Sequence, residues 1–153
     1  MKIDISQFTV ESYDGVLALW QQCDGIGLSE ADSRESIQAY LDRNRRMSFI
    51  ALSDGKVVGA VLAGHDGRRG YIHHLAVAAN CRRQGLARQL VDHCLAALAD
   101  AGIRKCHIFI FNGNADGIAF WKAAGWTSRS DIRVISKTIQ PAPGHVRRSP
   151  ERE

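Results

Sequence analysis

The sequence predicts a mixed α/β domain, and three observations support this fold class. The chain has 153 residues, a length that suits a single domain. Hydrophobic residues form 45% of it and charged residues 24%, which excludes a disordered chain, a collagen-like repeat and a coiled coil. Segments with strand periodicity and segments with helical periodicity follow one another along the chain. No apolar run approaches the roughly 18 residues of a membrane span, so none is expected.

The N-terminal part predicts one strand and two helices. Met1–Val10 alternates apolar and polar side chains, as a strand does. Tyr13–Cys23 places its apolar side chains at helical spacing. Arg34–Arg43 repeats that spacing, and Asp32 and Ser33 precede it as candidate caps.

Three strands of an antiparallel meander are predicted next. Met47–Leu52 and Lys56–Gly64 flank Asp54 and Gly55, a residue pair that favours a two-residue hairpin turn. A second turn, rich in glycine and charge, leads to Tyr71–Ala78. We expect this last strand to close the meander.

The remaining elements predict a helix, a strand, a helix and a final strand region. Cys81–Ala101 carries one apolar helical face. Lys105–Phe111 has the composition of a buried strand, Ala115–Ala124 that of a helix, and Trp126–Ile139 that of one or two further strands. Because strand–helix–strand connections within one sheet are right-handed, we expect Tyr71–Ala78 and the strand after the long helix to be parallel.

The end of the chain differs in composition from the rest. All three prolines lie in Gln140–Glu153, and this segment has almost no apolar content. Such a segment cannot bury enough surface to order itself. We therefore expect one domain over residues 1–139 and a flexible tail over residues 140–153.

The four cysteines are predicted to be free thiols. They form no CxxC pair, and no histidine cluster gives them zinc spacing, so neither a metal site nor a disulfide framework is expected: Cys23, Cys81, Cys94 and Cys106. The N-terminus lacks the basic and long apolar regions of a signal peptide. We therefore expect a cytoplasmic protein, whose thiols stay reduced.

The junction between the meander and the long helix has the features of a pyrophosphate site. The first amides of a helix have no partners within it, and the helix dipole adds positive potential there. Gly85 and Ala87 keep the approach open, and Arg82, Arg83 and Arg88 supply cations for phosphate oxygens. The alternative is an arginine-rich helix start in which glycine only ends a loop. No Walker loop and no GxGxxG fingerprint is present.

These residues also resemble a known family. Arg82-x-x-Gly85-x-Ala87 is similar to the R/Q-x-x-G-x-G/A signature of the GNAT superfamily of N-acyltransferases, and it follows the strand residues Leu75, Ala76 and Val77. About 30 residues later, Asn114–Trp126 resembles a second block of that family. The resemblance extends from Met1 to about Ile139 and includes the order of the elements.

The resemblance implies a fold and a cofactor site. The meander strand and the later parallel strand are expected to splay apart, and acetyl-CoA is the implied co-substrate, without a metal. The main chain of the strand would pair with the pantetheine arm. The implied cofactor-binding residues are Leu75, Ala76, Val77, Arg82, Arg83, Gln84, Gly85, Leu86, Ala87, Arg88 and Asn114. For Asn114 the alternative is an ordinary turn residue.

Acyl transfer to an amine needs a base and an oxyanion donor. Strand alternation places Tyr71, His73, Leu75 and Val77 on one face, and the imidazole of His73 resembles a base proposed in one branch of the family. His74 is expected on the opposite face, unless a bulge exchanges the two. A backbone amide of Leu75 or Val77 would stabilise the oxyanion.

The expected proton donor to the leaving thiolate is missing. Trp121 stands where many relatives carry a tyrosine, and an indole is not a usable acid. Water then protonates the thiolate, or the thiolate leaves as the anion. Helix packing is the alternative role of Trp121.

The leading hypothesis is an N-acetyltransferase that uses direct attack in a ternary complex. The acceptor would be a primary amine of a small molecule, a peptide or a protein. The alternatives are a non-catalytic acyl-CoA-binding module and a transferase for another acyl group. The net charge of +4 permits an anionic partner, but nucleic acid is not expected, and neither is a membrane. A homodimer is left open by the resemblance alone.

Overall fold

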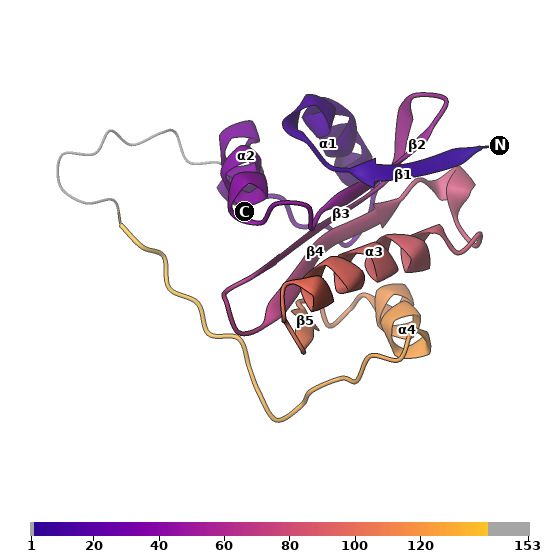
Figure 1. Cartoon of the computed structure of the whole chain (residues 1–153). Helices are drawn as coiled ribbons and strands as arrows, with labels where there is room; N and C mark the ends of the chain where they lie inside the picture. Colours follow the sequence, from indigo (N-terminus) through magenta and orange to yellow (C-terminus); the bar gives the residue numbers. More distant parts are fainter. Residues whose placement is uncertain (1, 141–153) are drawn as a thin grey trace.

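A five-stranded sheet in the order β1-β2-β3-β4-β5 forms the centre of the computed structural model, which describes residues 2–140 (Figure 1). The strands are β1 (Ile3–Gln7), β2 (Phe49–Ser53), β3 (Lys56–His65), β4 (Gly70–Val77) and β5 (Cys106–Ile108). The α-helices are α1 (Tyr13–Gln22), α2 (Arg34–Arg43), α3 (Leu86–Asp100) and α4 (Ala115–Ala123). Three short 3-10 helices join them: η1 (Val10–Ser12), η2 (Glu30–Asp32) and η3 (Ala79–Cys81).

The sheet is mixed, as the sequence predicts. Strands β1 to β4 pair with one another in antiparallel fashion, and β5 is parallel to β4 across the α3 crossover. The mixed α/β fold class is therefore confirmed.

Each face of the sheet carries its own apolar core. Helices α3 and α4 cover one face, and α1 and α2 cover the other (Figure 1). From Ala60 on, the side chains of β3 alternate between the two cores: Val61 and Ala63 face α3, whereas Ala60 and Leu62 face α1 and α2. Val58, at the register shift between β2 and β3, also faces α3. A strand covered on both faces needs apolar residues at successive positions, which explains why this strand has no polar face.

Strand β4 breaks this alternation at a β-bulge. Its register with β3 shifts, and His74 there has a φ of +53°. The ring of His73 contacts Tyr40 of α2, and the ring of His74 contacts Trp20 of α1, so both histidines lie on the face covered by these helices. The prediction that His74 faces the opposite layer is wrong, because a bulge adds one residue and reverses the alternation beyond it.

Strands β4 and β5 pair over a short length and then separate. The parallel pairing joins Gly70–Ile72 to Cys106–Ile108, and β4 continues beyond it to Val77 without β5. The strand predicted over Lys105–Phe111 is correspondingly shorter, because its second half has no neighbour to pair with. The expected splay of the two strands is present.

The last described segment contains no regular structure. Residues 127–140 form no helix or strand and are exposed throughout. The strands predicted within Trp126–Ile139 are therefore absent from this structure, in which no strand among residues 2–140 lies beside them. Residues 141–153, most of the predicted tail, lie outside the described residues.

Residues 2–140 contain no helix that is long and apolar enough to span a bilayer. All four cysteines are free thiols, and Cys81 and Cys94 are buried.

Candidate active site

The open edge of β4 forms one side of the candidate site. The amide of Ala78 donates to the carbonyl of Val58 of β3 over 2.8 Å. Because main-chain groups alternate in direction along a strand, the N–H and C=O of Val77 point away from β3. They point into the space left where β5 diverges, and so do those of Leu75, two residues earlier. Of the predicted residues, Leu75 and Val77 therefore provide a strand edge without a strand partner, whereas Ala76 is paired with Ala60 of β3.

The N-terminus of α3 forms the second side. Gly85 is the N-cap, with a φ of +78°, and it has no side chain to accept the first amides of the helix. A β-carbon added to Gly85 would meet no atom within 4 Å, so open space lies in front of this helix end. Leu86 is buried and offers only its main chain, whereas Arg83, Gln84 and Arg88 are exposed. These amides and cations give the helix start a positive potential.

Arg82 joins the two sides of the site. Its Nε donates to the carbonyl oxygen of Val77 over 3.1 Å, and its terminal nitrogen lies 4.0 Å from the Sγ of Cys23. The side chain predicted to bind phosphate thus ties the helix start to the open edge of β4. A guanidinium carries five N–H groups, so others remain that could donate to an anion.

The loop between α1 and η2 bounds the site on a third side. A β-carbon on Gly25 would come within 2.9 Å of the Nδ2 of Asn114, and one on Gly27 would come within 3.2 Å of the Phe111 ring. The loop therefore packs directly against the connection from β5 to α4. Asn114 is the N-cap of α4, and its Oδ1 accepts from the amide of Gly117 over 3.0 Å. Its turn role is thereby established, and its amide nitrogen faces the loop.

His73 lies in an aromatic environment beside the splay. Its ring centroid is 6.2 Å from that of Tyr40, 6.4 Å from that of Tyr71 and 6.1 Å from that of Phe109. Burial, followed by the nearby His74, lowers the pKa of His73 below its usual value, while Asp32 acts in the opposite direction. The imidazole is therefore neutral at neutral pH and able to accept a proton.

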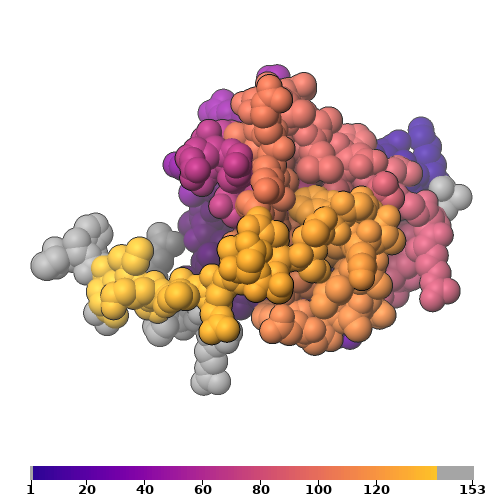
Figure 2. All heavy atoms as spheres, turned by 90° about the horizontal axis from the view of Figure 1, so that it is seen from below, coloured from indigo at the N-terminus to yellow at the C-terminus, as the bar shows by residue number. Residues whose placement is uncertain are grey.

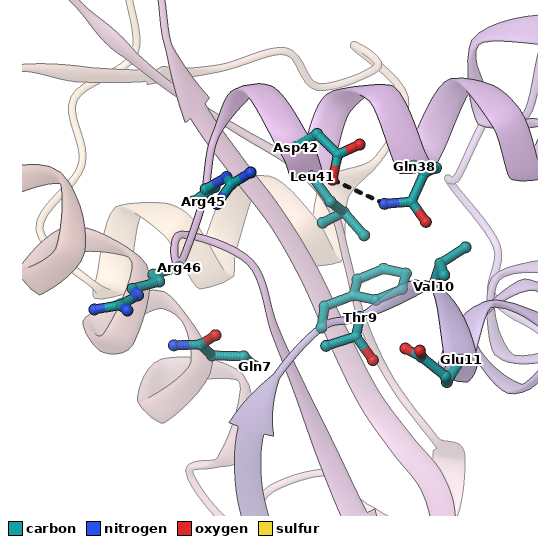
Figure 3. A pocket seen from close by; sticks show the side chains of 10 residues that line it. Gln7, Thr9, Val10, Glu11, Gln38, Leu41, Asp42, Arg45 and Arg46 are labelled. Carbon is teal, nitrogen blue, oxygen red and sulfur yellow. Dashed lines mark hydrogen bonds between the residues drawn. The ribbon is translucent and has the colours of Figure 1, made fainter.

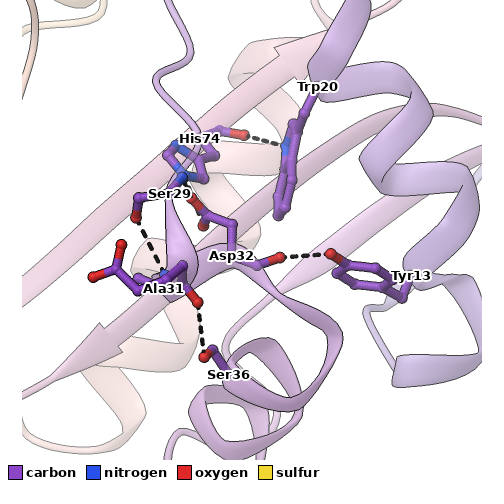
Figure 4. Close-up of polar contacts among 8 residues, drawn as sticks. Tyr13, Trp20, Ser29, Ala31, Asp32, Ser36 and His74 are labelled. Atoms are coloured by element: carbon purple, nitrogen blue, oxygen red, sulfur yellow. Dashed lines mark hydrogen bonds and ion pairs between the residues drawn. The ribbon is translucent and has the colours of Figure 1, made fainter. Parts of the chain in front are cut away.

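His74 forms a hydrogen bond with a carboxylate that the sequence did not reveal. Its Nε2 lies 2.9 Å from the Oδ1 of Asp32, which is 8% exposed, and Oδ2 of the same carboxylate accepts from the amide of Ser29 over 3.1 Å (Figure 4). Because an ionised carboxylate only accepts hydrogen bonds, Nε2 carries the proton. The sequence predicts Asp32 only as a candidate helix cap, and nothing in either segment signals its contact with His74, 42 residues away.

Two further bonds hold the bulge in place. The indole Nε1 of Trp20 donates to the carbonyl of His74 over 3.0 Å, and the Tyr13 hydroxyl donates to the carbonyl of Asp32 over 2.6 Å (Figure 4). A non-glycine residue with a left-handed φ carries strain. The contacts of His74 to Asp32 and Trp20 offset that strain and fix the direction of both histidines.

Trp121 is a packing residue in this structure. Its ring meets that of Phe120 at 5.2 Å and that of Trp126 at 4.7 Å, both edge to face. The cluster anchors α4 against the α3-side core. The packing role that the sequence offered as an alternative is the one observed.

A separate hollow lies between α2 and the segment that joins β1 to η1. It has a volume of about 410 Å³ and is lined by the end of β1, η1 and α2, with Asp42, Arg45 and Arg46 at its rim (Figure 3). No residue of β4, α3 or α4 lines it. This open hollow is remote from the splay and shares none of the predicted site residues.

The comparisons with known proteins agree with this geometry. A family model described as "Acetyltransferase (GNAT) family" matches residues 13–126. An acetyltransferase from Pectobacterium atrosepticum is 28% identical over 138 residues, which cover 90% of this chain and 97% of the relative.

Two solved structures share the fold. AAC(6')-Iy in complex with the bisubstrate analog CoA-S-monomethyl-acetylneamine matches with a TM-score of 0.73 and 19% identity, over 91% of this chain and 100% of that chain. The PaiA N-acetyltransferase from Thermoplasma acidophilum in complex with coenzyme A matches with a TM-score of 0.70 and 15% identity, over 80% of this chain and 88% of that chain. Because the family model spans more than half of the sequence, the chain belongs to the acetyltransferase (GNAT) family.

Proposed function

We propose that the chain is an acetyl-CoA-dependent N-acetyltransferase that transfers the acetyl group to a primary amine by direct attack in a ternary complex. One observation carries the proposal: the unpaired edge of β4 meets the uncapped N-terminus of α3 at an open space. The structures of AAC(6')-Iy with a CoA bisubstrate analog and of PaiA with coenzyme A are fold neighbours whose ligands support this reading.

The residues at the junction fit acetyl-CoA chemically. The pantetheine arm contains amides, for which the main-chain groups of Leu75 and Val77 are suitable partners. The pyrophosphate is an anion, for which the amides of residues 84–88 and the exposed Arg83 and Arg88 are suitable. Asn114 would contribute its side-chain nitrogen from the far side of the splay.

The chain's own groups supply the remaining chemistry. Acetyl-CoA, when bound, supplies an activated thioester, so that a C–N bond forms as the C–S bond breaks. His73 accepts the proton of the attacking amine, directly or through water, because its lowered pKa keeps it neutral. The amide of Leu75 or Val77 donates to the oxyanion. A thiol pKa near 8.5 makes the thiolate a tolerable leaving group, so Trp121 need not act as an acid.

His74 and Asp32 are positioning residues in this scheme. Their contact stabilises the bulge and thereby turns His73 toward the acceptor side. Asp24 and Glu30, both exposed in and beside the loop that bounds the site, add negative charge there. Such a rim favours a cationic amine over an acidic acceptor. The acceptor is accordingly a primary amine of a small molecule, peptide or protein, and a cytoplasmic location stays a prediction.

The test is release of free CoA from acetyl-CoA in the presence of amines, measured by chromatography. A panel of polyamines, a lysine peptide and a free N-terminal peptide separates the acceptor classes. We expect amine-dependent CoA release that falls in His73→Gln and is unchanged in His93→Gln, an exposed histidine on α3. Binding of acetyl-CoA without release would assign an acyl-CoA-binding module, and release only from a longer acyl-CoA would assign another acyl group.

A further inference from the structure

The excess positive charge of the chain is concentrated at one edge of the sheet. Three segments meet there: residues 42–46 at the end of α2, residues 66–69 between β3 and β4, and residues 100–105 from the end of α3 to β5. They contain three acids and seven cations: Arg43, Arg45, Arg46, Arg68, Arg69, Arg104 and Lys105. This excess of four equals the net charge of +4 of the whole chain, so the charges elsewhere balance. We call these three segments the basic edge.

Hydrogen bonds hold the three segments of the basic edge side by side. The amide of His65 donates to the Oδ1 of Asn44 over 3.1 Å, which joins the β3–β4 turn to the end of α2. The amide of Gly70 donates to the carbonyl of Lys105 over 2.9 Å, which joins the same turn to the start of β5. In the space-filling view the magenta atoms of the turn lie next to the orange atoms that follow α3 (Figure 2). The cations therefore gather in space.

The cations of the basic edge lack acidic partners. Within residues 2–140, no ion pair joins any of the seven to an acid, and six of them are exposed. Asp66 is bonded to main chain instead, because its Oδ1 accepts from the amides of both arginines of the turn, each over 2.8 Å. The pKa of Asp131 is lowered to about 2 by hydrogen bonds from Arg129 and, to a smaller extent, by the charge of Lys105. Exposed guanidinium groups without a partner are suited to the carboxylates of another molecule.

A row of aromatic rings leads from the basic edge to His73. Tyr71 follows Arg69 by two residues on β4, and its ring stacks on those of His73 at 6.4 Å and Phe109 at 6.0 Å. The Phe109 side chain is 60% exposed, and Tyr71 and His73 are partly exposed. Exposed rings that adjoin one another are typical of a contact surface. Because a strand advances about 3.3 Å per residue, Arg69 lies roughly 13 Å from His73 along β4.

We propose that the acceptor is a peptide or protein segment with acidic side chains about four to five residues from its reacting amine, and that the basic edge binds these side chains. The inference rests on the proposed function, in which His73 accepts the proton of that amine. An extended segment whose amine lies at His73 crosses the rings of Tyr71 and Phe109 and reaches the basic edge with its fourth and fifth residues. The acids Asp24 and Glu30 act on the amine end, and the basic edge acts on the other end.

A nucleic acid is the other class of polyanion that would meet these cations. Its sugar–phosphate backbone has no primary amine to accept an acetyl group, whereas a peptide carries one at its N-terminus or on a lysine. The row of rings also joins the basic edge to the amine site rather than leading away from it. Both observations favour the acidic peptide.

The test measures peptide binding separately from catalysis. A fluorescent ten-residue peptide with a free N-terminus and glutamates at its fourth and fifth positions is titrated with the full chain, and anisotropy reports binding. One matched peptide has glutamines at these positions, and another has the glutamates at its ninth and tenth positions. We expect the first peptide to bind about tenfold more tightly than either control at low salt. The difference should shrink to about twofold in 0.5 M salt, because salt screens exposed charges.

Two charge-reversal variants locate the contact. Arg68→Glu should reduce the tenfold preference to about threefold or less, because it replaces a cation of the basic edge by an acid. Lys56→Glu makes the same change of charge at the other end of β3 and should keep the preference. Both side chains are exposed, and the bond of Asp66 to the amide of Arg68 persists in the variant. An unchanged melting transition would show that each variant folds.

Three results would overturn the inference. Equal affinity for the glutamate and glutamine peptides would show that the basic edge does not read acidic side chains. An equal loss of preference in Lys56→Glu would show that only the overall charge matters. A single-stranded oligonucleotide that displaces the labelled peptide at lower concentration than the unlabelled acidic peptide does would assign the basic edge to nucleic acid.

Release of CoA from acetyl-CoA with the same peptides separates this inference from the proposed function. Release with the glutamine peptide, together with equal binding of both peptides, would leave the proposed function standing and overturn the role of the basic edge. Preferential binding of the glutamate peptide without release of CoA from any peptide would overturn the acceptor role together with the proposed function. We expect release with both peptides and a lower KM for the glutamate peptide.

Discussion

Replacing Asp32 by alanine tests the contact between Asp32 and His74 at the β4 bulge. The carboxylate is 8% exposed and accepts from His74 over 2.9 Å and from the Ser29 amide over 3.1 Å. Hydrogen bonds to a charged group contribute roughly 1.5–3 kcal/mol each. The His74 side chain is 20% exposed, so water replaces part of the loss. We therefore expect Asp32→Ala to lower the free energy of unfolding by about 3 kcal/mol.

The assay is thermal and urea unfolding of matched variants. At about 3 °C per kcal/mol for a chain of this length, Asp32→Ala should lower Tm by about 9 °C. Asp32→Asn keeps an acceptor for the Ser29 amide, so it should lower the free energy of unfolding by less than Asp32→Ala does. Glu30→Ala, an exposed acid two residues away, should cost less than about 0.5 kcal/mol. If Asp32→Ala costs no more than Glu30→Ala, the carboxylate does not hold His74 and the account of the bulge is wrong.

Three other variants probe the site, with Gly102→Val as a control. Gly85→Val and Gly102→Val both place a side chain at a left-handed φ with open space around it, at opposite ends of α3, so each should lose about 1–2 kcal/mol of stability. Only Gly85→Val should weaken acetyl-CoA binding in calorimetry, by tenfold or more; equal affinities in both would remove the helix start from the site. In His73→Gln, the free energy of unfolding should fall less steeply than in the wild type as the pH is lowered. The folded-state pKa of His73 is lowered, so the unfolded chain takes up its proton first, and wild-type stability falls as pH drops below the ordinary value near 6.5, by at most about 1.4 kcal/mol per pH unit. Identical pH–stability curves for the two proteins would contradict the burial of His73. Arg82→Met should weaken acetyl-CoA binding and lower Tm by a few degrees, because it removes the bond to the Val77 carbonyl; an unchanged Tm would show that this bond contributes little.

The fold was predictable where local chemistry determines it. The Asp54–Gly55 turn, the apolar face of α3 and the turn at Asn114 before α4 each depend on neighbours in sequence, and each lies where it was expected. The junction of β4 and α3 was predicted for the same reason, and its role as a cofactor site stays a prediction. Glycine at the N-cap and arginines around it are features of one short segment.

The sequence-based predictions fail where contacts between residues far apart in the sequence determine the local structure. The bulge at His74 depends on Trp20 and Asp32, which lie 54 and 42 residues away, and no periodicity within β4 reveals them. The strands predicted in Trp126–Ile139 have suitable residues, but a strand also needs a neighbouring edge, and none lies beside them within residues 2–140. The bond of Arg82 to the Val77 carbonyl was not predicted, because it depends on the tertiary fold, and the phosphate contact of Arg82 stays a prediction.

The central claim is that acetyl-CoA lies along the open edge of β4 with its pyrophosphate at the start of α3. Thermal unfolding with acetyl-CoA and with acetyl-pantetheine, which lacks the pyrophosphate, tests it most directly. At a ligand concentration near 100 times Kd, binding stabilises the native state by about 2.7 kcal/mol, a rise in Tm of several degrees. We predict this rise for acetyl-CoA and a much smaller one for acetyl-pantetheine. Equal shifts would contradict the pyrophosphate assignment, and no shift at millimolar acetyl-CoA would contradict the cofactor site as a whole.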